Sequence, residues 1–79
     1  MTPPSEHLLP LRGDYITLAH ALKLIGLASS GGQAKHLVRG GVVRVNGVVE
    51  TQPGRKLRAG DHFGPGDGPT WTIVAEPNL

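Results

Sequence analysis

The chain has 79 residues, of which 12 are glycine, 7 are proline and none is cysteine. A chain of this length forms one small domain, and the lack of cysteine excludes a disulfide scaffold and any cysteine-ligated metal site. No apolar run approaches the roughly 20 residues that span a bilayer. Prolines and a glutamate also interrupt the N-terminal region, where a signal peptide needs an apolar stretch. We therefore expect a soluble, cytoplasmic protein.

The formal net charge of +2 conceals an uneven distribution of charge along the chain. Residues 17–60 contain seven basic side chains and one acid, Glu50, whereas the rest of the chain contains one base and five acids. A surface that only maintains solubility mixes both signs. This concentration of positive charge favours a polyanionic partner, but it does not separate RNA from DNA.

The two ends of the chain differ in pattern from its middle. Residues 1–13 carry three prolines and no apolar period, so we expect a flexible N-terminal arm. A single folded domain is expected over residues 14–75, followed by a frayed tail at residues 76–79. The sequence contains no internal repeat and no sign of a second domain.

A first amphipathic helix is predicted over residues 16–27. Its apolar residues recur at helical spacing, which places His20 and Lys23 on the opposite face. Thr17 is suited to cap the N-terminus, because its hydroxyl can accept a backbone N–H of the first turn. Gly26 suits the left-handed conformation that ends many helices.

A second short helix is predicted to open at Ser30 and to stop at Gly40-Gly41. Ser30 and Gln33 have the spacing of a capping box. The apolar side chains of this helix face inward, which leaves basic residues on the outer side. These basic residues are Lys35, His36 and Arg39.

Two adjacent glycines, Gly31 and Gly32, occupy the first turn of this second helix. Glycine inside a helix costs about 1 kcal/mol relative to alanine, so their presence needs a reason. They could relieve crowding where the two helices meet. Alternatively, the missing side chains could let a phosphate reach the free N–H groups of the helix N-terminus. The sequence leaves both explanations open.

Residues 43–50 alternate around Asn46-Gly47, a pair typical of a two-residue type I′ hairpin. Val43 and Val45 are expected on the buried side and Arg44 on the exposed side. A basic segment, a short strand at residues 62–63, a flexible loop at residues 64–69 and a last strand at residues 70–74 follow. The fold class expected is α+β, with two short N-terminal helices packed on a small, mostly antiparallel sheet that carries a basic hairpin.

No arrangement of residues in the sequence indicates catalysis. The four histidines are scattered, and the glycine pair lacks the ending of a phosphate-binding P-loop. His20 and His36 have no acidic or cysteine co-ligand at a suitable spacing for a metal. We therefore expect no enzyme activity, no cofactor and no metal.

The order of these motifs resembles the S-four RNA-binding domain, or αL motif, named after protein S-four of the small ribosomal subunit. The resemblance extends from about Ile16 to Phe63. Within the family, the sequence is most similar to the small bacterial members that consist of this domain alone. It is most specific at Ala34-Lys35, at residues 41–47 and at Gly60-Asp61.

The resemblance implies that the two helices and the hairpin form a basic surface that grips structured RNA mainly by its shape. The sequence departs from the family's pattern at two places. Gly31 stands where most members have an arginine, and residues 16–18 are Ile-Thr-Leu where members often begin the first helix with Arg-Leu-Asp. The RNA contacts that the resemblance implies are Lys23, Ser30, Gly31, Gly32, Gln33, Lys35, Arg39, Arg44, Asn46, Arg55, Lys56 and Arg58.

We therefore expect a non-enzymatic, monomeric RNA-binding protein whose partner is structured RNA, in particular ribosomal RNA or a ribosomal particle. One alternative is a winged-helix-like binder of duplex DNA. The Ser-Gly-Gly start of the second helix argues against it, because a groove-reading helix needs long polar side chains there. Another alternative is an adaptor whose basic face docks on an acidic protein; it predicts weak RNA binding.

Overall fold

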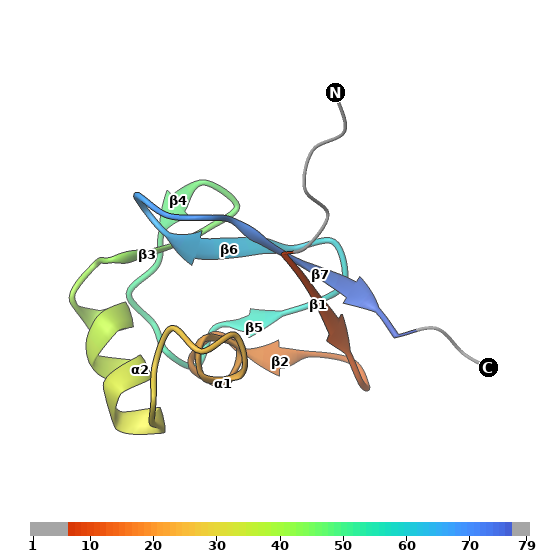
Figure 1. Cartoon of the computed structure of the whole chain (residues 1–79), viewed down its shortest axis with the longest axis horizontal. Helices are drawn as coiled ribbons and strands as arrows, with labels where there is room; N and C mark the ends of the chain where they lie inside the picture. Colours follow the sequence, from red (N-terminus) through yellow and green to blue (C-terminus); the bar gives the residue numbers. More distant parts are fainter. Residues whose placement is uncertain (1–6, 77–79) are drawn as a thin grey trace.

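The structure is a computed structural model that describes residues 7–76. Two layers make up the fold: a five-stranded sheet lies on one side, and two helices with a two-stranded sheet lie on the other (Figure 1). Within this part of the chain, no helix has the length and apolar character to cross a membrane.

The five-stranded sheet has the strand order β1-β7-β6-β3-β4. Its strands are β1 (Leu8–Leu11), β7 (Trp71–Ala75), β6 (His62–Pro65), β3 (Val43–Val45) and β4 (Val48–Val49). β1 runs parallel to β7, and the remaining neighbours are antiparallel. The predicted α+β fold, with a mostly antiparallel sheet, is confirmed; two strands, however, precede the helices.

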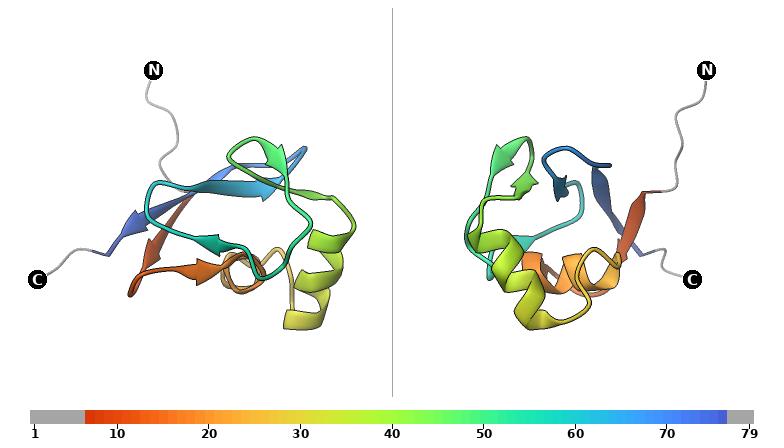
Figure 2. Two further views of the ribbon diagram at one scale, coloured as in Figure 1. Left: turned by 180° about the vertical axis from the view of Figure 1, so that it is seen from behind. Right: turned by 60° about the vertical axis from the view of Figure 1, so that its left-hand side comes forward.

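The second layer begins with β2 (Ile16–Thr17), which pairs with β5 (Lys56–Leu57) and leads directly into helix α1 (Leu18–Leu24). Helix α2 (Gly31–Arg39) packs beside α1. Figure 2 shows α2 at one end of the molecule, below β3 and β4, whereas β1 and the last residues of β7 lie at the other end.

The core fills the space between the two layers. Side chains of the five-stranded sheet that face inward meet the apolar faces of both helices and of β5, and Phe63 is the largest of them. Alternation along β3 and β6 and helical spacing along α1 and α2 select these residues. The buried core consists of Leu11, Leu18, Ala21, Leu22, Ala28, Ala34, Val38, Val43, Val45, Leu57, Phe63 and Ile73.

Helix α1 is shorter than the predicted range of residues 16–27. Thr17 does cap it, since its Oγ1 accepts the N–H of His20 at 3.3 Å. The helix starts only at Leu18 because Ile16 and Thr17 are extended and pair with β5. It ends at Leu24, and Gly26 follows with a φ of +82°, as a left-handed stop requires.

Helix α2 begins and ends where the sequence predicts. The Oγ of Ser30 accepts the N–H of Gln33 at 3.1 Å. The Gln33 side chain does not return to Ser30, as a capping box would require; its Oε1 accepts the N–H and the hydroxyl of Ser29. At the other end Gly41 has a φ of +77°, and its N–H donates to Val38.

The β3–β4 hairpin has the predicted turn. Asn46 and Gly47 have φ values of 52° and 85°, and both must be positive in a type I′ turn. Val43 and Val45 are buried, whereas Arg44 between them is exposed. The hairpin therefore presents its arginine on the outer face of the sheet.

The prediction of a flexible arm over residues 1–13 is wrong for residues 8–11, which form β1. Leu11 is buried, and β1 pairs in register with residues 72–75 of β7. Proline at position 10 argued against a strand, yet proline is tolerated at the edge of a sheet, and β1 is an edge strand. Residues 1–6, and residues 77–79 of the predicted tail, lie outside the described residues.

The predicted loop at residues 64–69 is also partly wrong, because Gly64 and Pro65 belong to β6. Backbone hydrogen bonds hold the remaining turn: the N–H of Gly66 donates to Val42, and that of Gly68 donates to Pro65. The last strand is shifted by one residue from the predicted range, and it extends to Ala75 because that residue pairs with Leu11 of β1.

Candidate nucleic-acid interface

The outer face of α2 carries exposed basic side chains. Lys35 and Arg39 stand one helical turn apart and are exposed, whereas the preceding residues Ala34 and Val38 are buried. Neither basic side chain forms an ion pair or a hydrogen bond with another residue among 7–76. Their charges are therefore available to an external anion.

The N-terminus of α2 is open to solvent. Gly31 and Gly32 are exposed, and their N–H groups have no partner four residues back within the helix. A Cβ added to Gly31 would have no atom within 4 Å, and one at Gly32 would meet only the Ser30 hydroxyl at 3.9 Å. The crowding explanation for these glycines is therefore wrong, and the phosphate-access explanation stays a prediction.

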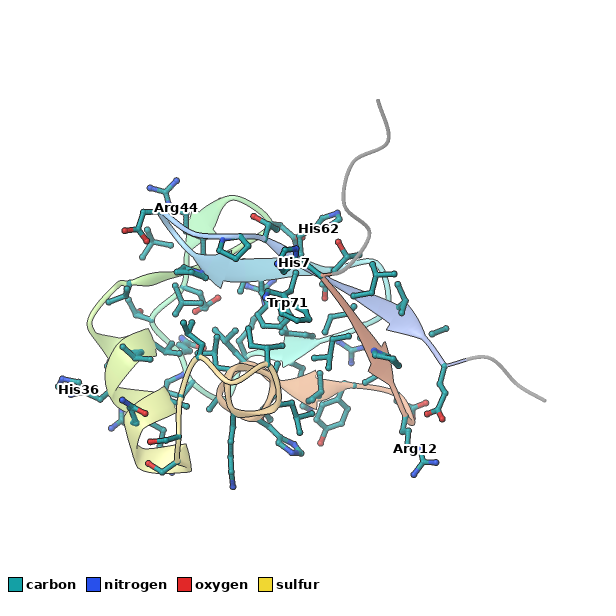
Figure 3. All side chains as sticks on the ribbon, in the orientation of Figure 1. His7, Arg12, His36, Arg44, His62 and Trp71 are labelled. Carbon is teal, nitrogen blue, oxygen red and sulfur yellow. The ribbon has the colours of Figure 1, made fainter. Side chains whose placement is uncertain are left out.

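Arg44 adds a third cation near this end of the molecule. Figure 3 shows Arg44 and His36 at one end, with Arg12 at the other. The Arg44 side chain lies against Gly66, where an added Cβ would stand 3.2 Å from its Nε. Among the described residues, it has no carboxylate partner. Lys23, in the last turn of α1, is likewise exposed.

Asn46, a predicted RNA contact, already has internal partners. Its Oδ1 accepts the N–H of His62 at 2.9 Å, and its Nδ2 donates to Oδ1 of Asp61 at 3.2 Å. The backbone N–H of Asn46 also donates to His62, at 2.7 Å. These bonds, with its positive φ, explain this residue through the fold.

Asp61 completes the same connection. Its Oδ2 accepts the backbone N–H of Arg58 at 2.8 Å. That hydrogen bond is the main reason why the pKa of Asp61 lies below its usual value, although partial burial opposes the shift. The Gly60-Asp61 pair therefore links the β5–β6 turn to the hairpin, with Gly60 at a φ of +98°.

Two of the predicted cations beside β5 have partners of their own. Arg55 forms an ion pair with Glu50, with 2.7 Å between Nη1 and Oε1. This hydrogen bond is the largest cause of the lowered pKa of Glu50. The Nζ of Lys56 lies 4.8 Å from the centre of the Tyr15 ring, within the range of a cation–π contact.

Arg58 lies away from α2. It lines an open cleft of about 780 Å³ together with Arg12, Asp14 and Glu76 at the end of the molecule where β1 and β7 finish. Arg12 forms an exposed ion pair with Glu76, with 2.9 Å between Nε and Oε2. Arg58 therefore does not share a surface with α2, and the basic residues do not form a single patch.

The structure divides the predicted site residues into groups that the sequence did not separate. One group, which we call the α2–hairpin surface, lies at the α2 end of the molecule and has no internal charge partners among the described residues. It consists of Ser30, Gly31, Gly32, Gln33, Lys35, Arg39 and Arg44.

Comparison with known proteins identifies this arrangement. A model of the S4 domain family matches residues 9–73, which run from β1 into β7 and include both helices and the hairpin. The chain belongs to the S4 domain family. The resemblance to the S-four domain is thereby confirmed, and this S4 domain extends beyond the range of residues 16–63 on which the resemblance was recognised.

A solved structure supports the same assignment. The solution structure of YbcJ from E. coli has a TM-score of 0.69 to this S4 domain, with 32% sequence identity over 95% of each chain. That structure is described as revealing an αL motif involved in RNA binding. Among curated proteins, no relative matches the chain.

Within residues 7–76, no three histidine, aspartate or glutamate side chains are grouped so that they could hold a metal ion. The four described histidines lie on different parts of the chain: His7 directly before β1, His20 on α1, His36 on α2 and His62 on β6. The α2–hairpin surface offers an anion the positive charges of its exposed basic side chains and the free N–H groups at the start of α2.

Proposed function

We propose that this S4-domain chain is a non-enzymatic, monomeric protein that binds structured RNA on the α2–hairpin surface. Membership of the S4 family and the likeness to an αL-motif protein involved in RNA binding support RNA as the partner. The observation that carries the proposal is that Lys35 and Arg39 are exposed one turn apart, without a carboxylate partner among the described residues.

Each part of the surface has a role in the proposal. Lys35 and Arg39 neutralise phosphates along one strand of the RNA, and the N–H groups of Gly31 and Gly32 donate to a further phosphate. Arg44 contacts the backbone from the hairpin. Recognition is by shape, because the major groove of an A-form helix is too narrow for side chains to read the bases.

Ribosomal RNA is the class that we propose, by analogy with the ribosomal protein after which the domain is named. The remaining predicted contacts are given lesser roles. Arg55 and Lys56 have partners within the protein, and Arg58 lies at the end of the molecule opposite α2. These three residues therefore attract the RNA by long-range electrostatics and do not contact its phosphates directly. Lys23, on α1, is proposed as a peripheral phosphate contact.

The test is the fluorescence anisotropy of a labelled RNA stem-loop and of a duplex DNA with the same number of nucleotides, across a salt series. We expect tighter binding to the RNA. Because each phosphate contact contributes roughly 0.7 to 0.9 to the slope of log affinity against log salt, the variant K35A/R39A should lower that slope by roughly 1.4 to 1.8.

The matched control is R12A combined with R58A, which removes the same charge from the other end of the molecule. We expect it to weaken binding much less and to leave most of the slope intact. If both double variants lost the same amount of RNA affinity, the protein would be a general binder of polyanions without a defined α2–hairpin site. Equal affinity for RNA and DNA would contradict RNA as the partner, and no binding to either would favour an acidic protein partner.

A further inference from the structure

The only tryptophan of the chain, Trp71, is incompletely buried although it faces the core side of the sheet. It stands opposite the buried Phe63 on β6, and residues 25–27, between α1 and α2, border the same space as its side chain. Beside it lies a small, open cavity of about 220 Å³, whose lining is more apolar than polar. None of the residues proposed to contact phosphates lines this cavity.

The walls of the cavity are aromatic and aliphatic. His7 packs edge to face with Trp71, with 5.0 Å between ring centres and 86° between ring planes. The remaining sides are lined by residues 25–27 of the α1–α2 segment, by Pro65 at the end of β6 and by Pro69 in the β6–β7 turn. No acidic side chain lines it, so a phosphate near its mouth meets no opposing carboxylate there.

The walls of the cavity include residues close in sequence to two parts of the α2–hairpin surface. Leu27 is four residues before Gly31, so the wall it forms is at most about 14 Å of chain from the open N-terminus of α2. Pro65, at the end of β6, is followed directly by Gly66, against which the Arg44 side chain packs. Figure 3 shows Trp71 near the middle of the molecule, with His7 beside it.

We propose that this cavity receives an unpaired nucleobase of the bound RNA, which stacks on Trp71. Sequence-tolerant stacking on aromatic side chains is how proteins hold single-stranded nucleotides, and every base offers an aromatic face. Further nucleotides of the same strand then extend from the cavity toward the N-terminus of α2, to which Leu27 is joined by four residues of chain. The inference rests on the proposed RNA-binding function and narrows it to RNA that contains unpaired nucleotides beside a duplex.

The test uses two RNA duplexes with the same stem, one fully paired and one with a short bulge of unpaired nucleotides. Binding is followed by anisotropy of a label on the RNA and, separately, by the fluorescence of Trp71. Because the chain has a single tryptophan, its emission reports on this cavity alone. We expect the bulged RNA to bind more tightly and to quench the emission, and the paired RNA to do neither.

The variant W71L keeps an apolar side chain against the core and removes the aromatic surface. We expect it to weaken binding of the bulged RNA by roughly 5- to 150-fold, the range for loss of one stacked base, and to leave the paired RNA unaffected. L27A, in the cavity wall, should have a smaller effect of the same kind. Its matched control is L24A, an exposed leucine of α1 outside this cavity.

The outcomes separate the two proposals. If both RNAs bind with equal affinity and Trp71 emission does not change, the nucleobase site is wrong while RNA binding stands. Equal weakening of both RNAs by W71L, with circular dichroism unchanged, would also overturn the site. If neither RNA binds the unmodified protein, the proposed function itself fails. The fluorescence of the unmodified protein decides the matter even if W71L does not fold.

Discussion

At the scale of single residues, Gly31 and Gly32 are the most informative positions. Both are helical and exposed, with room for a methyl group and no backbone conformation that demands glycine. Glycine in such a place lowers helix stability relative to alanine. Because the fold does not require glycine at these two positions, Gly31 and Gly32 are candidates for direct contact with the phosphate of a bound RNA.

We predict that G31A/G32A raises the free energy of unfolding by up to about 1 kcal/mol per site, because alanine is the better helix former. The same variant should weaken RNA binding by roughly two- to fivefold, since added methyl groups keep a phosphate from the N–H groups of the first turn. Urea unfolding measures the first effect and RNA anisotropy the second. G54A, at another open glycine, is the control and should leave RNA affinity unchanged.

Asn46 shows the opposite case at the same scale. The resemblance implied an RNA contact, yet its side chain bonds to His62 and Asp61 within the protein. Its backbone also adopts the positive φ that the turn requires. The presence of asparagine here is fully explained by the hairpin.

At the scale of elements, the hairpin and the β5–β6 turn are joined through the Asp61 carboxylate. It accepts hydrogen bonds from the Arg58 backbone and from Asn46, and the first of these is the main cause of its lowered pKa. A carboxyl group with a lowered folded-state pKa stabilises the fold above its unfolded pKa, near 3.8, and loses that contribution as the pH falls through the folded pKa.

We predict that D61A lowers the free energy of unfolding at pH 7 by about 1 to 3 kcal/mol, because it removes hydrogen bonds to a charged acceptor. The difference from the unmodified protein should narrow as the pH falls below about 3.8. Urea unfolding at a series of pH values measures it. D67A, in the exposed β6–β7 turn, is the control; a gap for D61A that does not change with pH would contradict the role of the charge.

The two helices show what local sequence signals decide. Thr17 and Ser30 cap them, and Gly26 and Gly41 end them, because these contacts join residues only a few positions apart. The start of α1 was predicted two residues early. Pairing of β2 with β5 is a contact between residues some 40 positions apart, and no local pattern announces it.

At the scale of the whole molecule, β1 closes the fold by pairing with the last strand. It brings Leu11 into the core and places Arg12 beside Glu76. A chain of this size has little stability to spare. The strand that looked like a flexible arm is therefore expected to be essential for folding.

We predict that L11A lowers the free energy of unfolding by about 2 to 5 kcal/mol, the range for a buried leucine. L8A, in the same strand but 45% exposed, should cost less than about 1 kcal/mol. Thermal and urea unfolding followed by circular dichroism measures both. If the two variants were equally harmless, β1 would behave as the flexible arm first expected from the sequence.

The distribution of charge also belongs to this scale. Seven bases between residues 17 and 60 suggested a single basic patch. In the folded molecule Glu50 pairs with Arg55, and Arg58 lies at the end opposite α2. Lys35 and Arg39 keep their charges free of carboxylate partners among the described residues.

The sequence by itself determined the helix caps, the type I′ turn, the alternation of buried and exposed residues and the membership of the S4 family. Each depends on residue types at spacings of a few positions, because helices, strands and turns are stabilised by neighbours along the chain. The tertiary structure alone decided that residues 8–11 form a strand, which cations have carboxylate partners, and that Trp71 borders a cavity. These features depend on contacts between distant segments, whose partners are chosen only when the whole core assembles.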